Sequence, residues 1–196
     1  MFDVDALKIW IEQNPDWISI SFFWIAFLES LAGIGLFMPG VILLALAATM
    51  ANIYNINLIE ILLYGYLGAC SADIISFFVG NYFKDKLDSI WPFSNNPEIL
   101  NKGRVFFKKY GIYSILIGRF LGPIRSILPL LAGTLKMPMK SFIIIDLISG
   151  IPWICFYVLP SYYVTQTINA NLTLLPYLIG LIFPIFTILI IRKFNG

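Results

Sequence analysis

The sequence predicts an all-α integral membrane protein built from two opposed re-entrant helical hairpins and about three transmembrane helices. Hydrophobic residues make up 59% of the chain, charged residues make up 12%, and the mean hydropathy is +0.85. Several apolar runs approach the length of about 20 residues that a helix needs to cross the hydrocarbon layer. Glycine and proline interrupt two of these runs, which predicts hairpins that turn back inside the membrane. A single membrane domain, 1–196, is therefore expected.

The first segment, 1–16, is predicted to be an interfacial amphipathic helix. Val4, Leu7, Trp10 and Ile11 recur at helical spacing, with acidic residues on the other side. Such a helix lies on the membrane surface, and the sequence favours neither a regulatory role nor a role as an amphipathic lid packed on the bundle.

The first re-entrant hairpin is predicted over 17–50, which is apolar apart from Glu29. Glycines and Pro39 interrupt it near the middle, and Pro39-Gly40 marks the expected break. The segment is too short for two full crossings of about 20 residues each with a turn between them. A transmembrane helix over 58–83 follows.

The segment 84–109 is predicted to be a cytoplasmic loop that leads into a basic amphipathic helix. Basic residues outnumber acidic residues there, and the chain ends near Arg192-Lys193. Positively charged loops favour the cytoplasmic side, so we expect both this segment and the C-terminus to be cytoplasmic.

The second re-entrant hairpin is predicted over 110–135. Gly122-Pro123 and Pro129 are its expected breaks, because proline removes a backbone donor and glycine lets the chain bend. Transmembrane helices are expected over 141–163 and 172–191, the latter an uncharged run.

Two arginines, Arg119 and Arg125, lie inside the second apolar hairpin. An arginine at the centre of a bilayer costs about 2.5–3.5 kcal/mol on insertion scales, so such residues face a protein interior or a wet cavity. On one unbroken helix the two side chains would point about 120° apart, and a break between them would aim both at one ligand. Planar guanidinium groups are suited to bidentate binding of phosphate. The alternative is that they pair with acidic residues and hold the hairpins together.

Three acidic residues are the candidate partners of these arginines. Glu29 and Asp73 can take up a proton, whereas arginine stays charged, so they are candidates for proton coupling or for ion pairing. Asp146 is interpreted as a secondary polar residue with a structural hydrogen-bonding role. Trp10, Trp17, Trp91 and Trp153 are interpreted as interface anchors and packing residues.

The two halves of the chain share one plan. Each half runs from an amphipathic segment through a broken hairpin into a spanning helix, with Glu29 and Asp73 in the first half and Arg119, Arg125 and Asp146 in the second. Paired broken segments in two halves of opposite topology are typical of inverted-repeat transporters, whose binding site lies near the midplane.

At these positions the chain resembles the DedA family of membrane proteins, also called the VTT or SNARE-associated domain group. The resemblance covers roughly residues 20–165 in order. The residues that carry it are Phe27-Leu28-Glu29, Pro39-Gly40, Gly68-Ala69, Asp73, Phe106-Phe107-Lys108-Lys109-Tyr110-Gly111, Gly118-Arg119-Phe120, Pro123-Ile124-Arg125, Pro129, Ala132-Gly133, Met137, Phe142, Gly150 and Trp153. Val41 is a departure, because many members have an acidic residue directly after this Pro-Gly pair.

The resemblance implies a lipid translocase of the bacterial cytoplasmic membrane that moves undecaprenyl phosphate or a phospholipid, with proton coupling as an option. A proton- or cation-coupled small-solute antiporter and a non-transporting scaffold of envelope assembly are the alternatives. The buried arginine pair favours the translocase, because phosphate capture uses both residues and a cation path would be repelled by them.

Other function classes are not expected. The chain has no histidine, so histidine-dependent catalysis and histidine metal sites are excluded, and we expect neither a metal site nor a cofactor. Cys70 and Cys155 stand singly in apolar runs and are interpreted as packing thiols. The expected partner is a membrane lipid with a phosphate headgroup, together with protons. No enzymatic activity and no nucleic-acid partner are expected, and homo-oligomers are left open.

Overall fold

The computed structural model describes residues 13–14, 16–89, 93–95 and 97–168, and all regular secondary structure within these residues is helical. The helices that build the body of the protein are α2 (Asp16–Ser30), α3 (Gly40–Ile53), α4 (Leu58–Phe83), α5 (Pro97–Tyr110), α6 (Tyr113–Gly118), α7 (Leu128–Thr134) and α8 (Met139–Ile168). The expected helix over 172–191 and most of the segment 1–16 lie outside the described residues.

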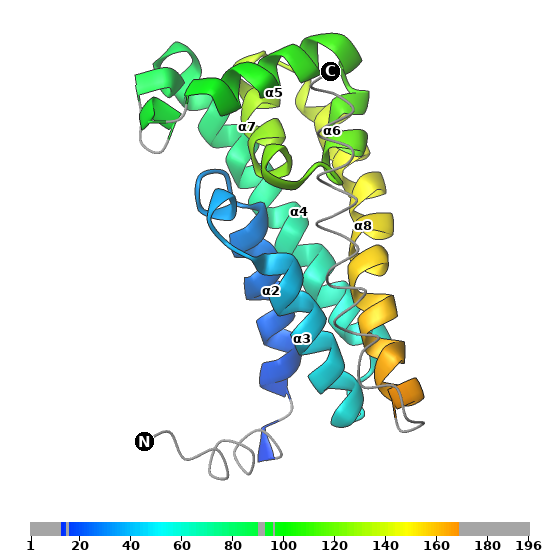
Figure 1. Ribbon diagram of the computed structural model, residues 1–196. Helices are drawn as coiled ribbons and strands as arrows, with labels where there is room; N and C mark the ends of the chain where they lie inside the picture. Colours follow the sequence, from blue (N-terminus) through cyan, green and yellow to red (C-terminus); the bar gives the residue numbers. More distant parts are fainter. Residues whose placement is uncertain (1–12, 15, 90–92, 96, 169–196) are drawn as a thin grey trace.

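The first hairpin consists of α2 and α3, which run antiparallel and are joined through the short 3-10 helix η1 (Ile34–Leu36) (Figure 1). They have 15 and 14 residues. At about 1.5 Å per residue each is roughly 20 Å long, which is less than the hydrocarbon thickness of about 30 Å. The connection is tied to α4, because the backbone N–H of Ala32 donates to the Ser76 hydroxyl at 3.0 Å. Pro39 is the N-cap of α3 and Gly40 its first residue, so the pair begins the returning helix.

The second hairpin consists of α6, the 3-10 helix η4 (Gly122–Ile127) and α7. Gly122 has a φ of 49°, a left-handed conformation that glycine adopts without the steric cost of a side chain, and the chain turns there. The expected break at Pro129 is corrected by the structure. Pro129 lies in the first turn of α7, where its missing N–H costs no helical hydrogen bond, so it helps to start this helix.

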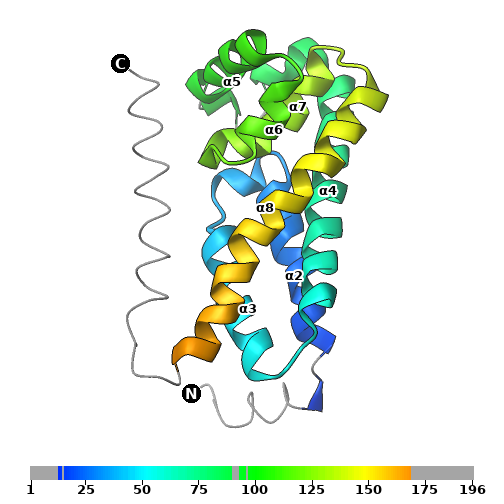
Figure 2. The same cartoon turned by 90° about the vertical axis from the view of Figure 1, so that its right-hand side faces the viewer.

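Two helices, α4 and α8, are long and apolar enough to cross a membrane by length and composition. α4 covers the range 58–83 that is expected from the sequence. α8 begins before the expected range 141–163 and continues beyond it, with Pro152 and Pro160 inside the helix. The two helices contact each other, and α4 also packs against α2 and α7 while α8 packs against α3 and α6 (Figure 2).

The basic helix α5 lies across one end of the bundle, after the 3-10 helices η2 (Lys84–Ser89) and η3 (Phe93–Asn95). Leu100 on its inner side is fully buried, whereas Val105 is exposed. Lys102, Lys108 and Lys109 of this helix are exposed as well, so most of its positive charge faces away from the interior.

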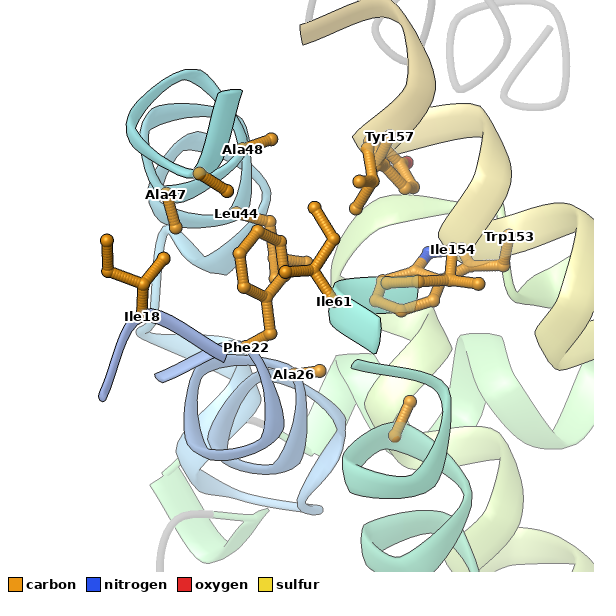
Figure 3. Close-up of a cluster of buried hydrophobic side chains, with 13 residues drawn as sticks. Ile18, Phe22, Ala26, Leu44, Ala47, Ala48, Ile61, Trp153, Ile154 and Tyr157 are labelled. Atoms are coloured by element: carbon orange, nitrogen blue, oxygen red, sulfur yellow. The ribbon is translucent and has the colours of Figure 1, made fainter. Parts of the chain in front are cut away.

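The largest buried apolar cluster joins the first hairpin to both long helices. Phe22 of α2, Leu44 of α3, Ile61 of α4 and Ile154 of α8 point toward one another in its centre (Figure 3). This cluster fixes the first hairpin against α4 and α8, and so it fixes the position of Glu29 near the end of α2.

The outer faces of the long helices are apolar as well. Ile59, Leu63 and Leu67 are exposed along α4 at a spacing of one helical turn, and Ile144 and Ile148 are exposed in the same way along α8. At the same time, ionisable side chains are buried between the helices. Apolar surfaces outside and charges inside are what a lipid environment requires.

Glycines allow α4 and α7 to cross at close range. A Cβ atom on Gly133 would overlap the carbonyl oxygen of Phe77, and one on Gly80 would overlap the carbonyl oxygen of Leu130. We therefore expect Gly133→Ala to lower the free energy of unfolding by about 1–3 kcal/mol, since backbone atoms cannot move aside without a shift of the helix. Thermal unfolding in detergent measures the effect.

The matched control is Gly103→Ala in α5. A Cβ atom there would meet the movable end of the Leu131 side chain, so we expect a much smaller loss of stability. Equal unfolding temperatures for the wild type and Gly133→Ala would contradict this account of the crossing.

Candidate functional site

The tips of the two hairpins meet in the middle of the bundle, where η4 contacts both η1 and the end of α2. The ionisable side chains that the sequence analysis singled out gather at this meeting point. Each is at most 9% exposed, and they are Glu29, Asp73, Arg119, Arg125 and Asp146. They come from α2, α4, the end of α6, η4 and α8.

Arg119 binds two carboxylates at once. It is the C-cap residue of α6, and its Nη2 atom donates to Asp73 Oδ2 at 2.5 Å and also to Asp146 Oδ1. Its guanidinium lies against Gly150, where a Cβ atom would approach Nη1 to 3.0 Å. Arg119 therefore connects three separate helices, α4, α6 and α8, through one buried side chain.

Arg125 has a different and looser set of partners. Its Nη1 atom lies 3.1 Å from Glu29 Oε1, its Nη2 atom donates to the Ser30 hydroxyl at 2.6 Å, and its Cζ atom lies 3.7 Å from the centre of the Trp153 ring. Nη1 faces Glu29 at ion-pair distance without the alignment of a hydrogen bond, and Nε is buried without a hydrogen-bond partner among the described residues. Arg125 is thus held by one carboxylate, one hydroxyl and one aromatic face.

The turn between the arginines directs both toward the same space. Gly122 with its positive φ interrupts the helical path after Arg119, and Arg125 follows in η4. A small cavity of about 10 Å³ is lined by both arginines, by Asp73 and Asp146, and by the apolar side of the second hairpin. This is about the room for one water molecule, so a phosphate group requires the hairpins or side chains to move.

The charges of the cluster do not balance. Three carboxylates face two guanidinium groups, which leaves one negative charge in excess when all five are ionised. One oxygen on each carboxylate, Glu29 Oε2, Asp73 Oδ1 and Asp146 Oδ2, is buried without a hydrogen-bond partner among the described residues. Unpaired buried charge is costly, so a cation could be added to the cluster, whereas an anion at Arg125 would have to displace a carboxylate.

All five ionisable residues that the sequence singled out are brought together, and the expected contact between the arginines and Glu29 or Asp73 is present. Asp146 is an ion-pair partner of Arg119, which is one of the pairings that the sequence allows beside a structural hydrogen-bonding role. The described residues contain no group of cysteine and carboxylate side chains that could hold a metal ion.

Sequence reasoning missed two partners of Arg125. Ser30 lies next to Glu29. The sequence suggests Trp153 as an interface anchor or packing residue, and the structure shows the packing role, because Trp153 is fully buried beneath Arg125. A signal for Trp153 was present in the sequence. Asp146, Gly150 and Trp153 are spaced by four and three residues, so they share one face of α8.

The apolar outer faces, the two helices long enough to span and the buried ion pairs define an α-helical membrane protein with a polar internal site. The model of the VTT domain matches residues 38–163, which is more than half of the chain. The chain therefore belongs to the VTT-domain family, the DedA group of membrane proteins.

Curated relatives agree with this assignment. The chain is 35% identical over 145 residues to an uncharacterized membrane protein of Buchnera aphidicola subsp. Schizaphis graminum, a match that covers 74% of this chain and 58% of the relative. It is 34% identical over 156 residues to the inner membrane protein YabI of Escherichia coli, with 79% and 61% covered. It is 26% identical over 124 residues to undecaprenyl phosphate transporter A of Bacillus subtilis, with 61% and 62% covered.

The chain spans about three fifths of the length of these relatives. No solved structure matches it. Membership of the family and of the membrane-protein class follows from these findings.

Proposed function

We propose that the chain moves a lipid with a phosphate headgroup, undecaprenyl phosphate or a phospholipid, across the bacterial cytoplasmic membrane without changing it covalently. The observation that carries the proposal is that the Arg125 guanidinium is buried with hydrogen-bond donors that have no acceptor in the part of the chain that the structure describes. This guanidinium is buried where the two hairpins meet. Beside its ion pair with Glu29 it makes one hydrogen bond, to Ser30, and its Nε donor has no hydrogen-bond partner among the described residues. A phosphate group supplies the oxygen acceptors that its remaining N–H donors lack.

The two arginines have different tasks in this proposal. Arg119 is already bound by Asp73 and Asp146, so it holds the helices around the site together. Arg125 is paired with Glu29 alone, and a phosphate that displaces this carboxylate keeps the guanidinium paired with negative charge. Arg125 is therefore the primary ligand for the headgroup, and Arg119 adds positive potential from the other side of the cavity.

In this proposal the two hairpins enter the membrane from opposite surfaces and form an inverted repeat. The lengths of α2 and α3, the short α6 and α7, and the contact between the two tips support this arrangement. The headgroup would pass between the tips while its hydrocarbon tail stays in the bilayer. The segment 84–109 and the C-terminus are assigned to the cytoplasmic side, because both are basic.

Reconstitution into proteoliposomes tests the proposal. Fluorescent undecaprenyl phosphate, a phospholipid and an uncharged polyprenol of the same tail are compared for protein-dependent movement between leaflets. We expect movement of at least one phosphate lipid and none of the uncharged polyprenol. Equal movement of all three would mean that the phosphate is not recognised, and no movement of any lipid would favour the scaffold function.

A proton- or cation-coupled small-solute antiporter is the second candidate, and the excess of carboxylates in the cluster is the observation in its favour. The two candidate functions differ in the species that crosses the membrane, which is a lipid in the first and a proton or small solute in the second. The same vesicles, loaded with a pH-sensitive dye, report proton movement in the absence of any transported lipid. Proton exchange driven by small cations without added phosphate lipid would support the antiporter.

Proton coupling gives a prediction about the carboxylates. We expect Glu29→Gln and Asp73→Asn to give folded proteins whose lipid transport no longer responds to an imposed pH gradient, because an amide cannot take up and release a proton. Transport at a pH gradient and at equal pH is compared for each variant. The control is Glu60→Gln, which changes an acid at the start of α4 outside the cluster. A wild-type response in both variants would leave these carboxylates a structural role.

A further inference from the structure

Trp153 is the one aromatic side chain among the described residues with a cation–π contact to a buried arginine. It lies on α8, fully buried beside Tyr157, with which it makes an edge contact at 5.4 Å between ring centres. Figure 3 shows Trp153 and Tyr157 on α8 as members of the apolar cluster that fixes the first hairpin. The ring is therefore fixed by its surroundings before any ligand binds.

One face of α8 serves both arginines. Asp146 pairs with Arg119, Gly150 makes room for the same guanidinium, and Trp153, three residues further along the helix, lies under Arg125. The contacts differ in chemistry. A carboxylate occupies N–H donors, whereas an aromatic face attracts the cation and leaves every donor in the guanidinium plane free for another partner.

We propose that Trp153 is a positioning residue for ligand binding, which holds the Arg125 guanidinium in place while its partner changes from the Glu29 carboxylate to the phosphate of the lipid. This inference rests on the proposed function and names a second residue of the same site. Without the ring, Arg125 would keep only its contact with Ser30 at the moment when Glu29 leaves. A long side chain with one contact samples many rotamers, and its donors are then no longer arranged for the phosphate.

The substitutions Trp153→Phe and Trp153→Leu separate the aromatic face from simple packing. Phenylalanine keeps a ring under the guanidinium, although tryptophan is the better cation–π partner, and leucine keeps apolar volume without a face. We expect the KM for phosphate lipid to rise about 30-fold in Trp153→Leu and no more than about threefold in Trp153→Phe, with similar kcat values. The control is Trp24→Leu, because Trp24 lies on the outer side of α2 and is 54% exposed.

A second measurement covers the case in which Trp153→Leu does not fold. Replacing Trp10, Trp17, Trp24 and Trp91 by phenylalanine leaves Trp153 as the single tryptophan. Undecaprenyl phosphate should shift the emission of Trp153 with a saturable dose dependence, and the uncharged polyprenol should not, because only the phosphate rearranges the cation over the ring.

The outcomes separate the two proposals. Unchanged KM in folded Trp153→Leu, or unchanged Trp153 emission at lipid concentrations that saturate transport, would overturn the positioning role while the proposed function stands. A wild-type protein that transports no phosphate lipid would overturn the proposed function, and the positioning role would fall with it.

Discussion

Arg125→Lys should lose most of the headgroup-dependent lipid transport, about 10- to 100-fold, although the positive charge is kept. Lysine is a point charge on a flexible stem and cannot offer two parallel N–H donors to a phosphate, nor can it lie flat on the Trp153 ring. Hydrogen bonds to charged groups contribute about 1.5–3 kcal/mol each, which gives a loss of this size when one is removed. The measurement is transport of phosphate lipid by purified protein in proteoliposomes.

Two controls accompany this substitution. Arg104→Lys makes the same exchange in α5, outside the site, and should leave transport unchanged. Thermal unfolding of Arg125→Lys should stay near that of the wild type, because an ammonium group can still pair with Glu29. Full transport by Arg125→Lys would count against phosphate recognition and favour a role in ion pairing.

Arg119→Ala should have its main effect on stability, because it leaves Asp73 and Asp146 without the guanidinium that they share. Removing one partner of a buried ion pair costs about 3–5 kcal/mol, since the remaining charge is uncompensated. We expect a lower yield of folded protein and a clearly lower unfolding temperature than for Arg125→Ala. That substitution leaves only one carboxylate, Glu29, without its guanidinium partner. Thermal unfolding in detergent and the monodisperse fraction after purification measure both effects.

A second substitution tests the cause of this loss. In the double variant Arg119→Ala/Asp146→Asn one of the two stranded carboxylates is gone, so part of the stability should return. Arg119→Lys should also restore part of it, because the charge remains between Asp73 and Asp146. A double variant that is less stable than Arg119→Ala would show that charge pairing is not what Arg119 contributes.

The two arginine predictions together distinguish a structural role for the ion pairs of Arg119 from a ligand-binding role for the ion pair of Arg125. Arg119 connects α4, α6 and α8, whereas Arg125 connects the tips of the two hairpins to Trp153 of α8. The proposed transport requires the tips to separate, because the cavity between them has a volume of only about 10 Å³. Contacts at the tips should therefore exchange during transport, while those around Arg119 should persist.

The sequence by itself determined the membrane character, the helical class, the range of α4 and the family. These follow from local properties, because hydropathy, helical spacing and the Gly-Pro breaks are encoded over a few neighbouring residues. It also identified all five ionisable residues of the site, because a charge within a long apolar run is exceptional wherever it occurs. Pro129 and the extent of α8 were less well predicted, since a proline is tolerated in a first turn and, with neighbouring helices present, inside a spanning helix.

Only the tertiary structure decided which acid pairs with which arginine. Arg125 and Ser30 are 95 positions apart, and Arg119 and Asp73 are 46 apart, so their pairing depends on how the two hairpins and the long helices pack. The same holds for Trp153, which the sequence suggests as an interface anchor or packing residue and which the packing of α8 buries beneath Arg125. The number of charges and their place in apolar runs are properties of the chain, whereas the sharing of one guanidinium by two carboxylates arises only when distant helices meet.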